Sequence, residues 1–275
     1  MRRLALLLFL ILPLGGFTSS ERLFAPSADL WPRWERHDPA SRESLDFAAW
    51  DALLRRVVIS GGDGINRVDY RGLAAADALA GIVADLAAVQ VSAYDRDQQL
   101  AYWINLYNAV TLQVVAQHYP VVTIRDIDIS PGWFADGPWD AEVVTVEGEA
   151  LTLNDIEHRI LRPIWRDPRV HYAVNCASLG CPNLAREAYR GETVDRQLEE
   201  AARVYINHPR GVTIADGEVT VSKIYDWFLE DFGGSTETLL AHLRRYAGPE
   251  LAGQLAAAGD IDGTAYDWTL NDASE

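Results

Sequence analysis

The residue types best suited to chemistry gather in one short stretch of this 275-residue chain. Residues 171–183 read His-Tyr-Ala-Val-Asn-Cys-Ala-Ser-Leu-Gly-Cys-Pro-Asn and contain both cysteines of the protein. We expect residues 171–174 to form a buried strand and Pro182 to begin a helix, which would place Cys181 at the N-cap of that helix. A helix N-terminus lowers the pKa of a thiol and favours the reactive thiolate. Cys176 and Cys181 are therefore the first candidates for a catalytic sulfur.

A thiol nucleophile needs a base and a group that orients the base. His158 and His171 are the candidate bases, and Glu157 is the candidate orienting group. A simple pair of His171 with Cys176 is disfavoured, because positions 171 and 176 point to opposite faces of a strand. We therefore expect a thiol from the turn, Cys176 or Cys181, to work with a histidine from another element.

A long helix should lie behind this stretch. Residues 95–118 are apolar on nearly every helical face, which is typical of a buried central helix. Asn105 and Asn108 share one stripe of that helix, and a buried amide without a partner costs about 1–3 kcal/mol. Both amides must be hydrogen-bonded, either in a structural network or to a substrate carbonyl. The predicted substrate contacts are Tyr102, Asn105, Asn108 and Asn175.

The remaining elements indicate an α+β fold. Apolar spacing predicts helices over residues 47–58 and 73–89. Two hairpins with an acidic residue and a glycine in the turn are each expected to run into a helix, and Thr152 with Asp155 resembles a capping box. The hairpins span 143–152 and 212–222, and the helices that follow span 153–162 and 223–232. We expect antiparallel strands and hairpins packed against several helices around the central one.

Some polar and aromatic residues are assigned structural roles only. Tyr225-Asp226-Trp227 and Tyr266-Asp267-Trp268 repeat one tripeptide, and aromatic side chains beside a carboxylate usually pack and hydrogen-bond. Asp226 or Asp231 could form a local ion pair with Lys223. None of these residues is predicted to take part in a site.

The first residues carry the pattern of an export signal. Arg2 and Arg3 precede an uncharged apolar run, and small residues follow up to Ser20. The apolar run is short for a bilayer span, which takes about 20 residues. We interpret residues 1–20 as a cleaved signal peptide, with an uncleaved membrane anchor as the alternative. The mature protein should then be periplasmic or secreted.

Charge limits the partners. The chain has 24 basic and 40 acidic residues, and loss of Arg2 and Arg3 with the signal leaves 22 against 40, a net charge of −18. Such a balance argues against nucleic acid and, after signal cleavage, against a membrane surface as a partner. A small-molecule or peptide substrate is compatible with it. We expect residues 21–45 to be an extended lead and residues 46–275 to be a single globular domain.

An oxidising compartment leaves three interpretations of the cysteine pair. A disulfide is the commonest fate of two nearby cysteines there. A reactive or redox-active thiol is the second. A metal site is the third and the weakest, because structural zinc takes four ligands and only distant histidines could join the two sulfurs. We predict neither a metal nor a cofactor.

Several ordered motifs resemble one known family. The chain is similar, over about residues 92–208, to the family called domain of unknown function 547. The matching motifs are Leu-Ala-Tyr-Trp-Ile-Asn-Leu-Tyr-Asn-Ala at 100–109, Leu-Asn-Asp-Ile-Glu-His at 153–158, and His-Tyr-Ala-Val-Asn-Cys at 171–176 with Cys181-Pro182. The resemblance implies no settled reaction. It does imply that Cys176 is the stronger catalytic candidate, because plant relatives tend to keep the first cysteine and vary the second.

Three functions fit these observations. The first is an exported thiol-dependent hydrolase or acyl transferase that acts on an amide, thioester or peptide. The second is a non-catalytic exported binding module whose two cysteines, Cys176 and Cys181, form a structural disulfide. The third is a thiol-redox protein, although the spacing of this pair differs from the usual two-residue separation. A free thiol of low pKa would favour the first, an inert disulfide the second, and an easily reduced disulfide the third.

Overall fold

The fold is built around one long helix, α4 (Arg96–His118). The structure is a computed structural model that describes residues 25–132 and 137–274, so the predicted signal peptide lies outside the described residues. Asp95 caps α4 by accepting a hydrogen bond from the backbone N–H of Gln98. Most side chains of this helix are buried, including polar ones. The predicted central helix is thus confirmed.

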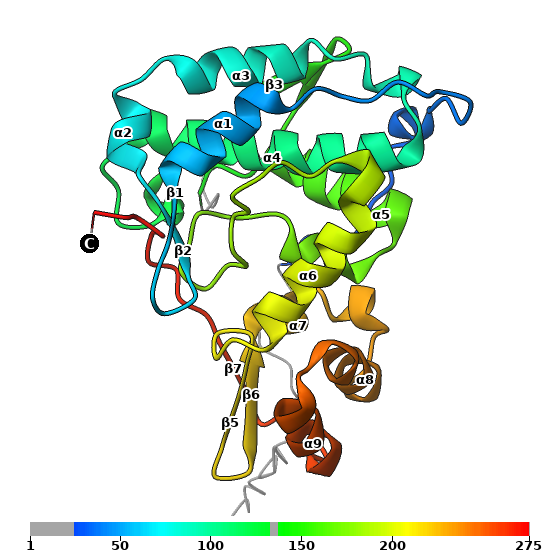
Figure 1. The fold of residues 1–275 in the computed structure, drawn as a ribbon, viewed down its shortest axis with the longest axis vertical. Coiled ribbons are helices and arrows are strands. Elements are labelled where there is room, and N and C mark those ends of the chain that lie inside the picture. The colour runs from blue at the N-terminus through cyan, green and yellow to red at the C-terminus, as the bar shows by residue number, and fades with distance from the viewer. Residues whose placement is uncertain (1–24, 133–136, 275) are drawn as a thin grey trace, which may run out of the picture.

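Other helices cover α4 on several sides (Figure 1). α2, α3 and α6 contact α4 directly, and α1 packs on α3. Their bounds are α1 (Ala48–Val57), α2 (Tyr70–Ala74), α3 (Ala78–Ala87) and α6 (Val194–Ile206). The helix predicted over residues 73–89 is two helices instead of one. Asp69 begins the first of them early, because its side chain accepts a hydrogen bond from the backbone N–H of Gly72.

The strands form small sheets. The antiparallel pairs are β1 (Val58–Ser60) with β2 (Asn66–Val68), β3 (Val144–Val146) with β4 (Glu149–Leu151), and β5 (Val212–Ala215) with β6 (Glu218–Ser222). In both predicted hairpins the two turn residues have positive φ, Glu147 and Gly148 in one and Asp216 and Gly217 in the other. This backbone matches the twist of two-residue hairpins. The α+β prediction is confirmed, although the parallel pairing of β7 (Gly263–Ala265) with β6 was not expected.

Each predicted hairpin leads into a helical segment that reaches the candidate site. The segments are a π-helix (Asp155–Leu161) continuing into α5 (Arg162–Trp165), and α7 (Lys223–Trp227) followed by a 3₁₀ turn (Leu229–Phe232). The Thr152 hydroxyl accepts from the backbone N–H of Asp155 at 2.9 Å, and the Asp155 carboxylate accepts from that of Thr152 at 3.0 Å, as a capping box requires. A π-helix widens the turn and often occurs at functional sites.

The stretch with the two cysteines differs from the prediction. Residues 168–172 form a 3₁₀ turn that Pro168 begins and the Asp167 side chain caps, so the buried strand predicted for residues 171–174 is wrong. A short apolar run cannot distinguish a strand from a buried helical turn. Pro182 does not begin a helix, and Cys181 is therefore not at an N-cap. Instead, the Pro182 carbonyl accepts a hydrogen bond from the side chain of Asn175.

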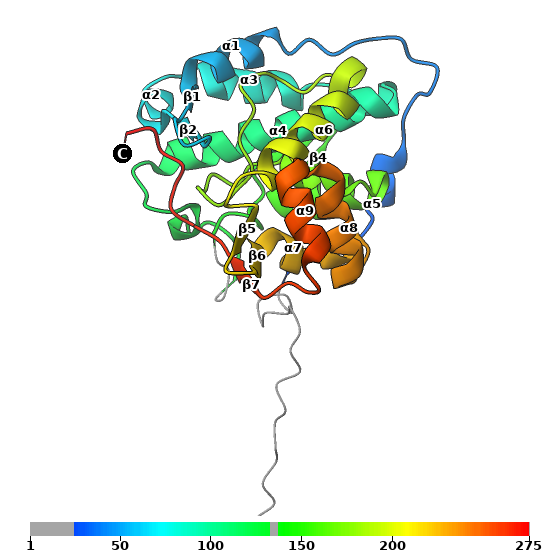
Figure 2. The same ribbon diagram turned by 60° about the horizontal axis from the view of Figure 1, so that its bottom comes forward.

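A second apolar cluster lies beside the one around α4. It involves β5, β6, α8 (Thr236–Tyr246) and α9 (Pro249–Ala257). α8 contacts α6, and Figure 2 shows α8 beside α9. Val170 and Ala173 belong to the cluster around α4 and Tyr172 to the second one, so the segment before the cysteines lies between the two clusters. The other 3₁₀ turns are Pro32–Glu35, Val91–Ala93, Ile124–Asp126, Pro168–Tyr172 and Gly191–Thr193. Within the described residues, no helix has the length and apolar character needed to cross a membrane.

Candidate active site

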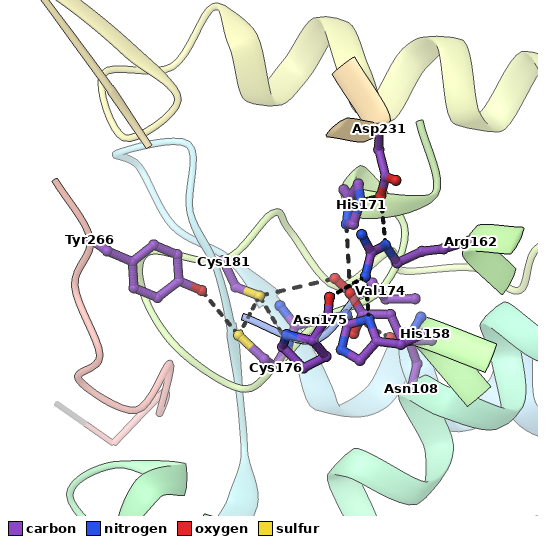
Figure 3. A network of polar contacts seen from close by, with 12 residues as sticks. Asn108, His158, Arg162, His171, Val174, Asn175, Cys176, Cys181, Asp231 and Tyr266 are labelled. Atoms are coloured by element: carbon purple, nitrogen blue, oxygen red, sulfur yellow. Dashed lines mark hydrogen bonds and ion pairs between the residues drawn. The ribbon is translucent and has the colours of Figure 1, made fainter. Parts of the chain in front are cut away.

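A cavity of about 430 Å³ opens beside the cysteines. All five predicted catalytic residues line it, namely Glu157, His158, His171, Cys176 and Cys181. Its wall also contains the aromatic residues Tyr107, Trp139, Trp227, Phe228, Tyr266 and Trp268. Figure 3 shows two polar groups at this site, the thiol pair with Tyr266 and a charged cluster around His171. A second cavity of about 490 Å³ contains none of the predicted site residues.

The two cysteines are free thiols in direct contact. Their Sγ atoms are 2.8 Å apart, and the backbone N–H of Cys176 donates to Cys181 Sγ at 2.9 Å. Cys176 is half-buried at the cavity wall, whereas Cys181 is only 3% exposed. The Tyr266 hydroxyl lies 3.0 Å from Cys176 Sγ, and the Ser178 hydroxyl lies 3.4 Å from it. The Cys176 sulfur therefore has three protic side chains around it.

The surroundings of the two thiols shift their pKa values in opposite directions. The hydrogen bond from Cys181 lowers the pKa of Cys176, and Ser178 and Tyr266 add to that effect, so that together they outweigh burial. Burial raises the pKa of Cys181 well above its usual value, and the adjacent Cys176 raises it further. When the pair loses one proton, the thiolate is thus favoured at Cys176 and the thiol is retained at Cys181.

The C-terminal segment holds the turn between the cysteines. The backbone N–H of Leu179 donates to the Thr269 carbonyl and that of Gly180 to the Asp267 carbonyl, both at 2.8 Å. A Cβ on Gly180 would lie 2.7 Å from the Asp267 nitrogen, so only glycine allows this close approach. Ala177 has a φ of 60°, a left-handed conformation that is uncommon for alanine. The turn is therefore fixed by contacts far along the chain.

His171 does not have a free nitrogen with which to act as a base. Its Nε2 is 2.7 Å from an Asp231 carboxylate oxygen and its Nδ1 is 3.6 Å from Glu157, while its ring stacks on Phe228 at 4.4 Å. Burial alone would lower the pKa of His171, but the hydrogen bond to Asp231 and the nearby Glu157 carboxylate outweigh it and raise the pKa. The imidazole is thus stabilised as a cation between two carboxylates.

His158, unlike His171, is held in its neutral form. Arg162 Nη1 lies 3.0 Å from His158 Nδ1, and because a guanidinium can only donate, Nδ1 must be the acceptor. The proton of the neutral ring is then on Nε2. Burial lowers the pKa of His158 to about 4, so the ring is neutral at physiological pH. His158, which lines the cavity, is therefore a neutral ring with its N–H at Nε2.

Glu157 and Asp231 complete the charged cluster. Burial raises the pKa of Glu157, but it is outweighed by His158, which becomes charged below its own pKa of about 4, and by His171 and Arg162, so that the pKa of Glu157 falls to about 2. Burial likewise opposes the charge of Asp231, whose bonds to His171 and to Arg162 Nε, at 2.6 Å, lower the pKa to about 2. Two carboxylates thus surround His171 and Arg162 at the cavity wall. The sequence did not predict Asp231 or Arg162 in this role.

The four predicted substrate contacts do not line this cavity. Asn108 donates to the Ala173 carbonyl and accepts from the Asn175 backbone N–H, each at 2.9 Å. Asn105 donates to the Tyr189 carbonyl at 2.8 Å and accepts from the Tyr189 N–H at 3.0 Å. These amides form the structural network that was one of the two predicted alternatives.

The other two predicted contacts are also occupied by the protein. The Asn175 side chain donates to the Pro182 carbonyl at 2.7 Å and accepts from the Ala177 N–H at 2.9 Å. The Tyr102 hydroxyl donates to the Leu86 carbonyl at 2.9 Å. Asn108 and Asn175 therefore position the loop that carries Cys176 and do not face the cavity themselves.

Comparison with known proteins identifies a family. Residues 91–206 match the family model described as "Protein of unknown function, DUF547". The chain contains a DUF547 domain. No curated protein matches the chain, and no solved structure does. All nine predicted site residues lie within the matched part.

The site extends beyond the matched part of the DUF547 domain. Asp231, Trp227, Tyr266 and Trp268 line the cavity or contact its wall, and all four follow residue 206. Tyr266 was assigned a packing role from the sequence, and Asp231 a local ion pair. The repeated Tyr-Asp-Trp tripeptides were a usable signal, since each contributes a tryptophan to the wall. Arg162, four residues after His158, was a second signal for a helical pair.

Chemically, the DUF547 domain combines an activated sulfur with a neutral hydrogen-bond donor. Cys176 supplies the sulfur and His158 the N–H, and both line the same cavity. Among the described residues, no group of three or more histidine, cysteine, aspartate and glutamate side chains has the arrangement to hold a metal ion.

Proposed function

We propose that the DUF547 domain of this chain is a thiol-dependent hydrolase or acyl transferase that acts on an amide, thioester or peptide. One observation carries the proposal. Cys176 Sγ lies at the wall of a cavity with the Cys181 thiol at 2.8 Å and the Tyr266 hydroxyl at 3.0 Å, and these hydrogen bonds favour the nucleophilic thiolate.

In the proposed reaction, the Cys176 thiolate attacks the substrate carbonyl carbon and forms a carbon–sulfur bond. The Nε2–H of His158 donates to the oxyanion that develops on the carbonyl oxygen. When the tetrahedral intermediate collapses, the bond to the leaving group breaks, and that group takes a proton from Tyr266 or Cys181. Water or a second nucleophile then attacks the acyl-Cys176 thioester, releases the product and returns the proton.

The charged cluster has a positioning role in this proposal. Arg162 donates to His158 Nδ1 and to Asp231, so it fixes which nitrogen of His158 carries the proton. His171 lies between Asp231 and Glu157 and keeps both carboxylates in place. A neutral imidazole can polarise a carbonyl without first giving up its proton, and a pKa of about 4 keeps His158 neutral at pH 7.

The aromatic wall of the cavity favours a substrate whose part next to the reacting carbonyl is uncharged. Trp227, Tyr266 and Trp268 are half-buried and pack on one another with ring centroids 4.7–5.6 Å apart. Flat aromatic faces bind apolar or planar groups and bury much area at low entropic cost. A small molecule or a peptide side chain fits this description, whereas the acidic chain disfavours nucleic acid.

The test is turnover of a panel of p-nitrophenyl thioesters and p-nitroanilides with acyl groups of increasing apolar area, in mild reductant. We expect hydrolysis and a mass-spectrometric acyl adduct on Cys176. Cys176→Ala should abolish both, and His158→Gln should lower kcat by about 10²-fold or more. His118→Gln is the matched control, because His118 is exposed at the end of α4.

A panel without any adduct or turnover would contradict the enzyme proposal. Binding of the same compounds to Cys176→Ala, followed by tryptophan fluorescence, would then favour the non-catalytic binding module. Equal turnover by the wild type and Cys176→Ala would show that the sulfur is not the nucleophile.

We also propose that the protein is exported and works in the periplasm or outside the cell, without a membrane partner after signal cleavage. The support is the order of Arg2, Arg3, the apolar run and the small residues up to Ser20. Cell fractionation with mass spectrometry of the N-terminus tests this. A cytoplasmic protein that starts at Met1 would overturn it.

A further inference from the structure

The thiol pair supports a second activity that does not depend on acyl transfer. We propose that Cys176 exchanges with a small-molecule disulfide in the cavity and that Cys181 then resolves the mixed disulfide, closing a reversible Cys176–Cys181 bond. The pair would thus give the site a thiol–disulfide exchange activity. Three features of the structure carry this inference: the contact of the sulfurs, their unequal exposure and the fixed turn between them.

The sulfurs are placed for direct exchange. Their separation of 2.8 Å exceeds a disulfide bond, which is about 2.05 Å long, by less than about 1 Å. The backbone N–H of Cys176 also donates to Cys181 Sγ at 2.9 Å, which holds the second sulfur against the first residue of the turn. A resolving attack therefore needs little movement of the backbone.

Unequal exposure sets the order of the two steps. Both cysteines line the cavity, but Cys176 is half-buried, whereas Cys181 is only 3% exposed. A disulfide that enters the cavity should therefore meet Cys176 first. The pKa values agree with this order, because the hydrogen bond from Cys181 lowers the pKa of Cys176 while burial raises the pKa of Cys181. In thiol–disulfide exchange the attacking species is the thiolate, so the cysteine with the lower pKa should attack first.

The turn between the cysteines is held by hydrogen bonds on the side of Cys181. Leu179 and Gly180 donate backbone hydrogen bonds to the C-terminal segment, and Cys181 N–H donates to the Ser178 carbonyl at 3.1 Å. These contacts keep Cys181 next to Cys176 when the latter is bound to another group. A mixed disulfide should thus be short-lived, because the resolving sulfur is always within reach.

The exchange balances without a metal or a cofactor. The Cys176 thiolate attacks one sulfur of a disulfide RSSR′, which forms Cys176–S–S–R and releases R′S⁻. Cys181 then attacks the Cys176 sulfur, its proton goes to the leaving RS⁻, and the intramolecular disulfide forms. The two protein thiols are oxidised and the small disulfide is reduced to two thiols. The reverse sequence, with the thiol in excess, reopens the site.

The cavity favours a small-molecule disulfide as the oxidant. A volume of about 430 Å³ is in the range of small-molecule sites and would not admit a folded protein. The aromatic wall beside Cys176, which includes Tyr266 and Trp268, offers apolar contacts to the carbon atoms on either side of the sulfurs. Glutathione disulfide is a suitable probe of this chemical class.

The test equilibrates the full mature chain with glutathione and its disulfide at several ratios, stops exchange with acid, and maps Cys176 and Cys181 by mass spectrometry. We expect the wild type to lose two hydrogens, to retain no glutathione, and to return to the dithiol as the ratio becomes reducing. Cys181→Ser should instead accumulate a stable adduct on Cys176. Cys176→Ser should leave Cys181 unmodified.

Three results would overturn the inference. They are a lasting glutathione adduct on the wild type, modification of Cys181 in Cys176→Ser, and a disulfide that does not respond to the glutathione ratio, which would indicate a structural clip. The wild-type titration needs no variant, so it decides the matter even if a substitution prevents folding. Failure of acyl transfer in the ester and anilide panel would not affect it, because no acyl substrate is used.

Discussion

At the scale of single residues, Cys176 owes its acidity to side chains and not to a helix. The sequence predicted a thiol at a helix N-cap, but no helix begins at Pro182. The pKa of Cys176 is lowered instead by the protic groups of Cys181, Ser178 and Tyr266, which all contact Cys176 Sγ. Hydrogen bonds to the charged form of a group lower the pKa of an acid, whatever element supplies them.

Removal of the Tyr266 hydroxyl should make Cys176 less acidic. In Tyr266→Phe one donor to the thiolate is lost, so the pH midpoint of Cys176 alkylation by iodoacetamide should rise by roughly one unit. The matched control is Tyr225→Phe, since the Tyr225 hydroxyl contacts Tyr172 at 3.4 Å and not the sulfurs. An unchanged midpoint in Tyr266→Phe would show that Tyr266 does not stabilise the thiolate.

At the scale of elements, α4 positions the cysteine loop through a single amide. Asn108 donates to the Ala173 carbonyl and accepts from the Asn175 N–H, which ties two successive peptide groups to the central helix. The Asn175 side chain in turn fixes the rest of the loop, through its hydrogen bonds to the backbone of Ala177 and Pro182. The asparagines that resembled substrate ligands are better explained as this scaffold.

Asn108→Ala should therefore destabilise the fold. It leaves the Ala173 carbonyl and the Asn175 N–H without partners in a buried place, and each unpaired group costs about 1–3 kcal/mol, so we expect a loss of about 2–4 kcal/mol in the free energy of unfolding by urea. Gln113→Ala, an amide on the same helix that is not fully buried, should change it by about 0.5 kcal/mol or less. Equal effects of the two substitutions would contradict the scaffold role.

The sequence predicted elements better than their conformations. The central helix, both hairpins and the Thr152 capping box could be predicted, because apolar periodicity and turn residues are local signals. The strand over residues 171–174 and the helix at Pro182 were wrong, because the C-terminal segment and Asn108 set the backbone there. Those are contacts between residues far apart in the chain, and a single sequence does not show them.

The candidate site was predictable to a similar degree. Residue types alone placed Glu157, His158, His171 and both cysteines together, and all of them line one cavity. Their roles depended on partners that arrive from other elements. Asp231 contacts Nε2 of His171 and stabilises the protonated ring, and Arg162 sets the tautomer of His158.

The charged cluster connects four helical elements and should give the fold a characteristic pH dependence. Glu157 and Asp231 have lowered pKa values, so their stabilisation is fully present above about pH 4.5 and is lost as the pH falls towards 2. His171 has a raised pKa, so its stabilisation is fully present below pH 6.5 and is lost as the pH rises through the folded value. The combined contribution of Glu157, Asp231 and His171 is therefore largest between pH 4.5 and 6.5. His158 acts in the opposite direction, because its pKa is lowered to about 4, so its contribution is fully present above pH 6.5 and is lost as the pH falls towards 4.

Asp231→Asn tests this window. It removes the charge that pairs with His171 and Arg162 and should cost about 3 kcal/mol of unfolding free energy within the window, less on either side. Urea denaturation at several pH values measures it. Asp195→Asn is the control, because the Asp195 side chain is 85% exposed and its bond to Arg169 should contribute less than about 1 kcal/mol. A cost that is the same at every pH would reject the charged cluster as its source.

At the scale of the whole molecule, the C-terminal segment closes the site that the DUF547 domain begins. Residues 263–265 add β7 to β6, Tyr266 and Trp268 line the cavity, and Asp272 bridges to Val68 on β2. Figure 1 shows this segment, in red, running from β7 past β2. A domain limited to the matched residues 91–206 would lack one donor to Cys176 and much of the aromatic wall.

The contact between the C-terminal segment and the cysteine turn can be tested by the substitution Gly180→Ala, which adds one methyl group. A Cβ at Gly180 would lie 2.7 Å from the Asp267 nitrogen and 2.9 Å from its carbonyl oxygen, so Gly180→Ala must push the C-terminal segment off the cysteine turn. We expect a loss of about 1–3 kcal/mol in stability and, because Tyr266 moves with the segment, a rise in the alkylation midpoint of Cys176 like that of Tyr266→Phe.

The control for that change is the same substitution elsewhere. Gly253 lies in α9, a Cβ there would meet no atom within 4 Å, and alanine is the better helix former, so Gly253→Ala should stabilise the protein by up to about 1 kcal/mol and leave the thiol unchanged. If Gly180→Ala lowered stability without moving the midpoint, the segment would support the fold but not the acidity of Cys176. A shift of both together would show that the cysteine chemistry depends on the far end of the chain.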